Sequence, residues 1–313
     1  HAAMNSPIEF CIQRRVTAHK TAEAWEATPH VSVLLDLDVT ELLGALEKIN
    51  REKAPEAPRI TVNSAMLFFI TRALRAAPHM NAHIQYDKAT ACGRITPHDA
   101  VHIALPMRLP DQRMFTPVLK HAEGCTIMEI TRKMQDLRRR ADNTDIDCLL
   151  LEAGLEDTWT RLRKGQLWTV LRRLYATFIG PDRLRRPTLS ERRAHKKRPG
   201  AERILPGELL EATIIVSNVG ASLPEIPVQL ILLEIIAPQT AAIGLNPIRK
   251  APRVVQNTQG EEILTIRSIL PITVCFDHRA MDFEHITGFF RMLTQDLNDP
   301  GRILFIDPKG DIP

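Results

Sequence analysis

The stretch Ile272-Thr-Val-Cys-Phe-Asp-His278-Arg-Ala-Met-Asp282-Phe-Glu joins an apolar, β-branched run to two ionisable side chains four residues apart. The run predicts a buried strand ending near His278, and the apolar spacing from Ile286 to Leu293 predicts a helix after it. Imidazole titrates near neutrality, so a histidine at the end of a strand suits proton transfer, and Asp282 could fix its tautomer or backbone. These residues alone fit a structural histidine near a helix start equally well.

The surrounding phrase, from Phe276 to Asp282, resembles the FDHRxxDG signature of the dihydrolipoyl acyltransferases of 2-oxo acid dehydrogenase complexes. That family shares its catalytic fold with chloramphenicol acetyltransferase. The resemblance implies that His278 is the general base and that Asp282 positions it. The chain departs from the signature at Phe283, where the family has glycine. The condensation domains of peptide synthetases are a poorer match, because they carry a second histidine where Asp277 stands.

Near the start of the chain, the stretch Ile-Gln-Arg14-Arg15, followed by Thr-Pro29-His, resembles the family's opening helix and first strand. In that family an arginine of the opening helix pairs with the aspartate of the histidine motif. The resemblance therefore implies an ion pair between Arg14 and Asp282, with Arg15 as the second candidate. Without it, both arginines would be expected to lie exposed on a helix face.

A third segment, Thr213-Ile-Ile-Val-Ser217-Asn218-Val-Gly220, resembles the family's TxxISNLG. The resemblance implies that the Ser217 hydroxyl donates to the oxyanion of the tetrahedral intermediate. It also places Asn218 and Phe283 among the residues that bind the thioester. Taken alone, Ser-Asn after an apolar strand would be expected to form a turn, since both side chains favour local backbone hydrogen bonds.

The resemblance covers roughly residues 8–141 and 211–306, and residues 143–210 interrupt it. The first half of this insertion has helical spacing of apolar and aromatic residues from Leu155 to Phe178, and we interpret it as a cap on the core. The second half, Asp182 to Arg198, carries eight Lys/Arg against two acidic residues. We interpret it as a solvated loop. The functional alternative is attraction of a polyanion, either coenzyme A phosphates or an acidic carrier protein, since no nucleic-acid-binding motif accompanies the charge.

Composition is ordinary for a soluble globular protein of 313 residues, with 44% hydrophobic and 25% charged residues and a formal net charge of +4. No apolar run is long enough to cross a bilayer, and no secretory signal is visible. The five cysteines are scattered without a CxxC pair, which indicates a cytoplasmic protein and, without HExxH, no metal site. Glycine loops for nucleotides are absent, and His79 and His83 are expected to be structural.

The resemblance implies an α/β two-layer sandwich with a mixed sheet and flanking helices, like chloramphenicol acetyltransferase. We expect one catalytic domain over residues 4–313, with the helical and basic insertion at 143–210. The resemblance also implies at least a homotrimer whose active site takes the histidine from one subunit and the serine from its neighbour. The donor would be acyl-CoA, such as acetyl-CoA, or an acyl carrier protein thioester, without metal or covalent lipoyl group.

The chain opens directly at the catalytic segment, with no lipoyl-lysine segment before it. We therefore expect a free-standing enzyme that moves an acetyl or other short acyl group to a small-molecule hydroxyl, in polyketide (tetronate) metabolism. One alternative is the catalytic core of a dihydrolipoyl acyltransferase from a 2-oxo acid dehydrogenase complex. Another is a non-catalytic thioester-binding or assembly protein, suggested by Phe283 and the insertion.

Overall fold

The computed structural model describes residues 10, 12–109, 113–153, 187–221 and 226–305. The helices expected between Leu155 and Phe178, and the basic residues 183–186, lie outside these ranges. In the part of the chain that is described, no helix has the length and apolar character needed to span a bilayer.

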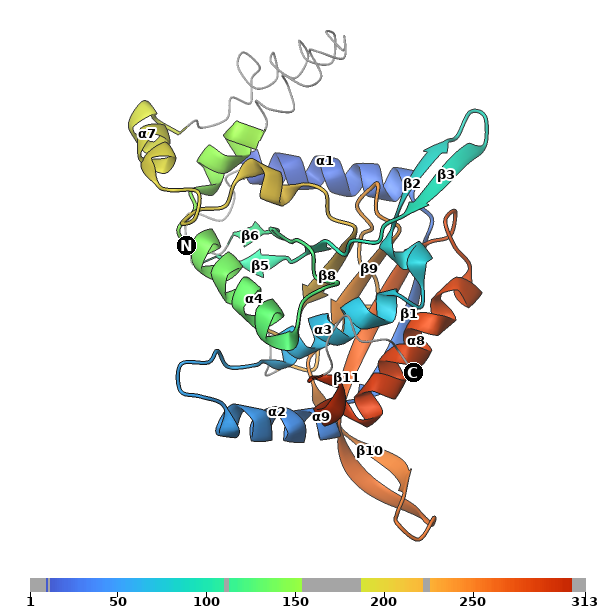
Figure 1. Ribbon diagram of the computed structural model, residues 1–313. Helices are drawn as coiled ribbons and strands as arrows, with labels where there is room; N and C mark the ends of the chain where they lie inside the picture. The colour runs from blue at the N-terminus through green and yellow to red at the C-terminus, as the bar shows by residue number, and fades with distance from the viewer. Residues whose placement is uncertain (1–9, 11, 110–112, 154–186, 222–225, 306–313) are drawn as a thin grey trace, which may run out of the picture.

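The described chain contains both helices and strands, often several of one kind in succession (Figure 1). The helices are α1 (Ile12–Ala27), α2 (Thr40–Glu52), α3 (Val62–Leu74), α4 (Ile127–Asp142), α7 (Leu189–Lys197), α8 (Phe283–Asn298) and α9 (Pro300–Ile303), with short 3-10 turns η1 (Pro78–Asn81) and η2 (Pro206–Leu209). The strands are β1 (His30–Asp38), β2 (Ala82–Asp87), β3 (Cys92–Pro97), β4 (Ile103–Ala104), β5 (Met107–Arg108), β6 (Met114–Phe115), β7 (Val118–Leu119), β8 (Ile214–Asn218), β9 (Ala241–Leu245), β10 (Arg249–Gln256) and β11 (Glu262–Asp277).

One sheet of seven strands organises the chain, in the order β1-β11-β9-β8-β4-β7 with β10 also paired to β11. The sheet is mixed, because β8 runs parallel to β9 and β4 while the other pairs are antiparallel. The long strand β11 pairs with β10 up to Ile269 and with β9 from Ile272. Pro271, which has no N–H to donate, lies where β11 changes partners.

Helices α3 and α8 pack together over one face of the sheet (Figure 1). Every residue of α3 from Ser64 to Leu74 is buried, which explains why its sequence is apolar almost all round. A glycine allows the close packing of α8, since a side chain at Gly288 would collide with the backbone carbonyl of Ala76. The expected α/β arrangement of a mixed sheet with flanking helices is confirmed.

The opposite face of the sheet is covered in part by the segment 228–236, which lies outside any strand. Ile235 packs there against Ala242 of β9 and Cys275 of β11. The backbone N–H of Leu233 donates to the Cys275 thiol at 3.2 Å, and burial raises the pKa of that thiol. Cys275 is therefore a packing residue of this second, smaller core.

Candidate active site

His278 directly follows β11, and its backbone N–H donates to the carbonyl of Pro29 at 3.0 Å. Its Nδ1 lies 3.3 Å from the carbonyl oxygen of Met281 and 3.3 Å from the carboxylate of Asp282. Both neighbours are acceptors, so the neutral ring carries its proton on Nδ1 and leaves the Nε2 lone pair free. The side chain is 53% exposed. His278 is thus held in the tautomer that a general base needs, with Nε2 accessible.

The loop bearing His278 is fixed by one ion pair, which joins the two residues that flank His278 in sequence. The Asp277 carboxylate is fully buried and accepts from Arg279 Nε at 3.0 Å and from the Arg279 backbone N–H at 2.9 Å. The same guanidinium reaches Thr28 Oγ1 at 3.3 Å and lies 5.3 Å from the Tyr86 ring. A buried carboxylate is costly unless it is paired, so this geometry is strongly constrained. This pair was not predicted, although an aspartate at a buried strand end with an arginine two residues later is a signal in the sequence.

The described residues show no contact between Arg14 and Asp282, so the ion pair implied by the resemblance stays a prediction. Arg14 is exposed near the beginning of α1, and the ion pair of Asp282 is with His278. Thr28, which directly follows α1, contacts Arg279 of the histidine loop, and Arg14 lies roughly 20 Å back along the helix at 1.5 Å rise per residue. Arg15 stands at nearly the same distance. Arg279 holds the loop instead.

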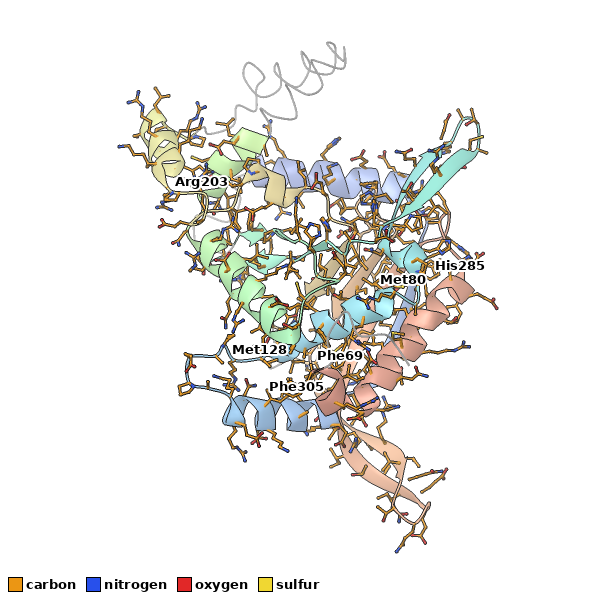
Figure 2. All side chains as sticks on the ribbon, viewed as in Figure 1. Phe69, Met80, Met128, Arg203, His285 and Phe305 are labelled. Carbon is orange, nitrogen blue, oxygen red and sulfur yellow. The ribbon has the colours of Figure 1, made fainter. Side chains whose placement is uncertain are left out.

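A second histidine, absent from the sequence analysis as a site residue, lies beside Asp282. The backbone N–H of Asp282 donates to Nδ1 of His285 at 3.1 Å, at the beginning of α8 (Figure 2). The His285 ring lies 4.6 Å from that of His79, and burial together with this neighbour lowers the pKa of His79. His83 Nε2 lies 3.0 Å from the carbonyl of Ala212. These contacts give His79 and His83 structural roles.

Phe283 is the first residue of α8 and does not need the backbone freedom of glycine, since its φ is negative. Its ring is 54% exposed and lies 6.2 Å from that of Phe290. The Phe283 ring adds exposed apolar surface directly after Asp282, and Asp282 is the residue that contacts His278.

We expect Phe283→Gly to broaden the range of acyl chains accepted, because a ring beside the histidine loop occupies space that glycine leaves open. The measurement is kcat/KM across a series of straight-chain acyl-CoAs. Phe290→Leu, two helical turns further along α8, is the matched control. An unchanged chain-length profile in Phe283→Gly would remove this ring from the account of specificity.

Ser217 lies in β8, level with Gly244 of β9 and Thr273 of β11. His278 comes five residues after Thr273, which is about 16 Å along the strand, and two strand spacings add roughly 10 Å sideways. The hydroxyl of Ser217 makes no hydrogen bond within the described residues and is half-buried. The structure therefore does not bring Ser217 and His278 of one chain together.

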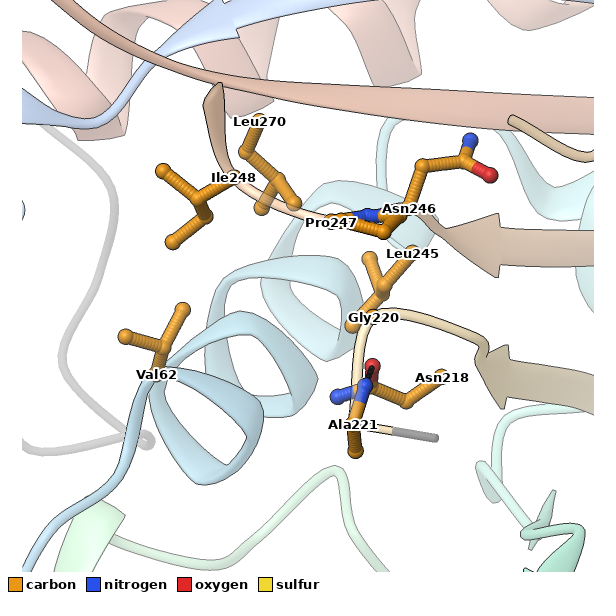
Figure 3. Close-up of a pocket in the computed structure, with 9 residues that line it drawn as sticks. All are labelled: Val62, Asn218, Gly220, Ala221, Leu245, Asn246, Pro247, Ile248 and Leu270. Atoms are coloured by element: carbon orange, nitrogen blue, oxygen red, sulfur yellow. Dashed lines mark hydrogen bonds between the residues drawn. The ribbon is translucent and has the colours of Figure 1, made fainter. Parts of the chain in front are cut away.

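Asn218 is held at the end of β8 by both atoms of its amide. Its Nδ2 donates to Asn63 Oδ1 at 3.0 Å, and its Oδ1 accepts from the backbone N–H of Ala221 at 2.9 Å. A cavity of about 250 Å³ opens beside it (Figure 3). It is lined by Val62, Asn218, Gly220, Ala221, Leu245, Asn246, Pro247, Ile248 and Leu270. A mostly apolar lining with a fixed amide suits the apolar part of a thioester better than its phosphates.

A larger cavity, of about 540 Å³, lies next to the histidine loop. Helix α1 contributes Glu23 and Glu26, the β2–β3 hairpin contributes Tyr86, and Arg279 closes one side. Its polar lining contrasts with the apolar cavity at Asn218. The two cavities therefore offer different chemistry, one beside Asn218 and the other beside the histidine loop.

Among the described residues, no group of three or more His, Cys, Asp or Glu side chains is placed to hold a metal ion. The chemistry of the site is that of a base and hydrogen-bond donors.

The chain matches the family model described as 2-oxoacid dehydrogenases acyltransferase (catalytic domain) over residues 6–148 and 186–305. It is 25% identical over 273 residues to the dihydrolipoyllysine-residue acetyltransferase component of the pyruvate dehydrogenase complex of Mycobacterium bovis. That alignment covers 86% of this chain and 37% of the relative, so the chain spans little more than a third of that protein. Residues 149–185, outside the match, fall within the expected insertion.

Solved structures with similar folds include the cubic core of the pyruvate dehydrogenase multienzyme complex, with a TM-score of 0.65 and 16% identity. The alignment covers 97% of this chain and 96% of that one. A dihydrolipoamide acetyltransferase of Azotobacter vinelandii has a TM-score of 0.64 and 16% identity, over 96% of this chain and 95% of its own. That structure was studied for the catalytic roles of a serine, a histidine and an asparagine four residues after the histidine.

Proposed function

The chain belongs to the family of 2-oxoacid dehydrogenase acyltransferase catalytic domains, and on that premise we propose that it transfers a short acyl group between two thiols. The carriers would be coenzyme A and a dihydrolipoyl group, in the core of a 2-oxo acid dehydrogenase complex. The observation that carries this proposal is His278, held through Nδ1 with Nε2 accessible. The relatives' names favour this alternative over the expected hydroxyl acceptor in polyketide metabolism.

In this mechanism, Nε2 of His278 takes the proton of the attacking thiol as its sulfur adds to the thioester carbonyl. The Ser217 hydroxyl of a neighbouring subunit donates to the oxyanion of the tetrahedral intermediate. Collapse expels the other sulfur as a thiolate, to which His278 returns the proton. The spacing of His278 and Asp282 matches that of the histidine and asparagine studied in the Azotobacter vinelandii enzyme, which supports the assignment.

A homotrimer or larger assembly follows from the mechanism, because Ser217 and His278 of one chain are too far apart to meet. Two further observations support it. A similar fold forms the cubic core of a multienzyme complex. The projecting β10–β11 hairpin (Figure 1) exposes Val254, Leu264 and Ile266, with Leu264 74% exposed, and such apolar surface marks contact between proteins.

The proposal is tested by supplying acetyl-CoA with dihydrolipoamide and measuring thioester formation and release of coenzyme A. Parallel reactions replace dihydrolipoamide with a panel of small-molecule alcohols. We expect turnover with the dithiol. Turnover confined to an alcohol would restore the hydroxyl-acceptor function. Binding of acetyl-CoA without turnover on either acceptor would identify a non-catalytic thioester-binding protein.

A further inference from the structure

Helix α7 is a short but well-fixed element outside the catalytic site. Thr188 accepts from the Glu191 backbone N–H at 3.3 Å, and the Glu191 carboxylate accepts from Thr188 in return. His195 anchors the helix, since it is 3% exposed and its Nε2 lies 3.1 Å from a guanidinium nitrogen of Arg203 (Figure 2). Burial and the Arg203 charge lower the pKa of His195, so the anchor is neutral.

The exposed side of α7 carries positive charge without a partner. Arg193, Lys196 and Lys197 are exposed and form no ion pair with any described residue. Their spacing of three and four residues places them on one face of the helix. Three of the four arginines of α4 differ, because each has a carboxylate partner: Arg138 with Asp142, Arg139 with Asp136, and Arg140 with Glu208.

The surroundings of this face indicate the kind of partner. No Phe, Trp or Tyr occurs from Pro187 to Gly207, so this described segment lacks the large rings on which nucleic-acid bases stack. Neither of the two cavities described above is lined by a residue of α7. A fixed, convex row of cations fits the acidic surface of a folded protein, because complementary charge steers such encounters.

We propose that the α7 face formed by Arg193, Lys196 and Lys197 docks an acidic acyl-carrier domain that delivers the thioester. This inference rests on the proposed acyl-transfer function and names its macromolecular partner. Docking raises the rate of encounter between the carrier and the enzyme, while the reaction itself remains with His278. Free acetyl-CoA does not use this face.

The test compares Arg193→Gln/Lys196→Gln/Lys197→Gln with a control of equal charge change, Lys48→Gln/Arg51→Gln/Arg59→Gln, whose side chains are exposed on and after α2. The probes are an acetylated bacterial acyl carrier protein of net negative charge, acetyl-CoA, and a single-stranded DNA 20-mer. Equilibrium dissociation constants are measured at several salt concentrations, without turnover. For the α7 variant we expect about tenfold weaker carrier binding at low salt and a flatter salt dependence, the scale typical of electrostatic steering.

The carrier affinity of the control variant, and the dissociation constant of both variants for acetyl-CoA, should stay at the values of the unaltered chain. Equal carrier affinities and salt slopes in the two variants, or no carrier binding by the unaltered chain, would overturn the proposal. Loss of DNA binding with unchanged carrier binding would assign the face to nucleic acid instead. Because docking is measured without turnover, an enzyme inactive with every acceptor would refute the proposed function while leaving this test intact.

Discussion

Replacing His278 with alanine should lower kcat for acyl transfer by about 10²–10⁴-fold, the usual contribution of a positioned general base. The physical reason is specific to this site. Nδ1 of His278 is engaged by the Met281 carbonyl and the Asp282 carboxylate, which leaves Nε2 as the basic atom. Alanine removes that base, and the attacking thiol then has to lose its proton to water.

The fold should survive this substitution, because the His278 side chain is half exposed and its backbone hydrogen bond to Pro29 remains. Assembly state and thermal unfolding therefore serve as readouts beside activity. His121→Ala, at an exposed histidine on a distant loop, is the matched control and should keep full activity. A His278→Ala protein that retains more than about a tenth of the original kcat would refute the general-base role.

Ser217→Ala should lower kcat by roughly 10²–10³-fold with little change in KM, the pattern expected when one donor to a developing oxyanion is lost. The hydroxyl makes no hydrogen bond within the described chain, so its removal leaves no buried partner unsatisfied. Ser32→Ala, which removes the hydroxyl of another strand residue, on β1, is the control. A loss of thermal stability that accompanies the loss of kcat would instead indicate a structural role for Ser217.

Much of the fold was predictable, because local patterns there agree with the final packing. The strand ending at His278 and the helix after it follow directly from hydrophobic spacing. The continuous β11 was not predicted as one strand, since pattern alone does not show that β10 and β9 pair with its two halves on either side of Pro271.

The candidate site was predictable in its chemistry and less so in its contacts. His278 and Asp282 meet as expected, because four residues of chain join them. Arg14 was assigned as the partner of Asp282 through family resemblance. Whether it can reach Asp282 depends on the direction in which α1 runs from the histidine loop. The contacts of Arg279 with Asp277 and of His285 with Asp282 depend on side-chain orientations that spacing does not determine.

The central claim is that one active site combines His278 of one subunit with Ser217 of its neighbour. Mixed assembly tests it directly: His278→Ala and Ser217→Ala proteins are denatured, combined in equal amounts and reassembled. In a cyclic trimer formed by random mixing, about a quarter of the interfaces regain an intact histidine facing an intact serine. Activity should then rise well above the mean of the two mutants, towards a quarter of the original. Activity that stays at that mean, with hybrid trimers verified by mass spectrometry, would contradict the shared site.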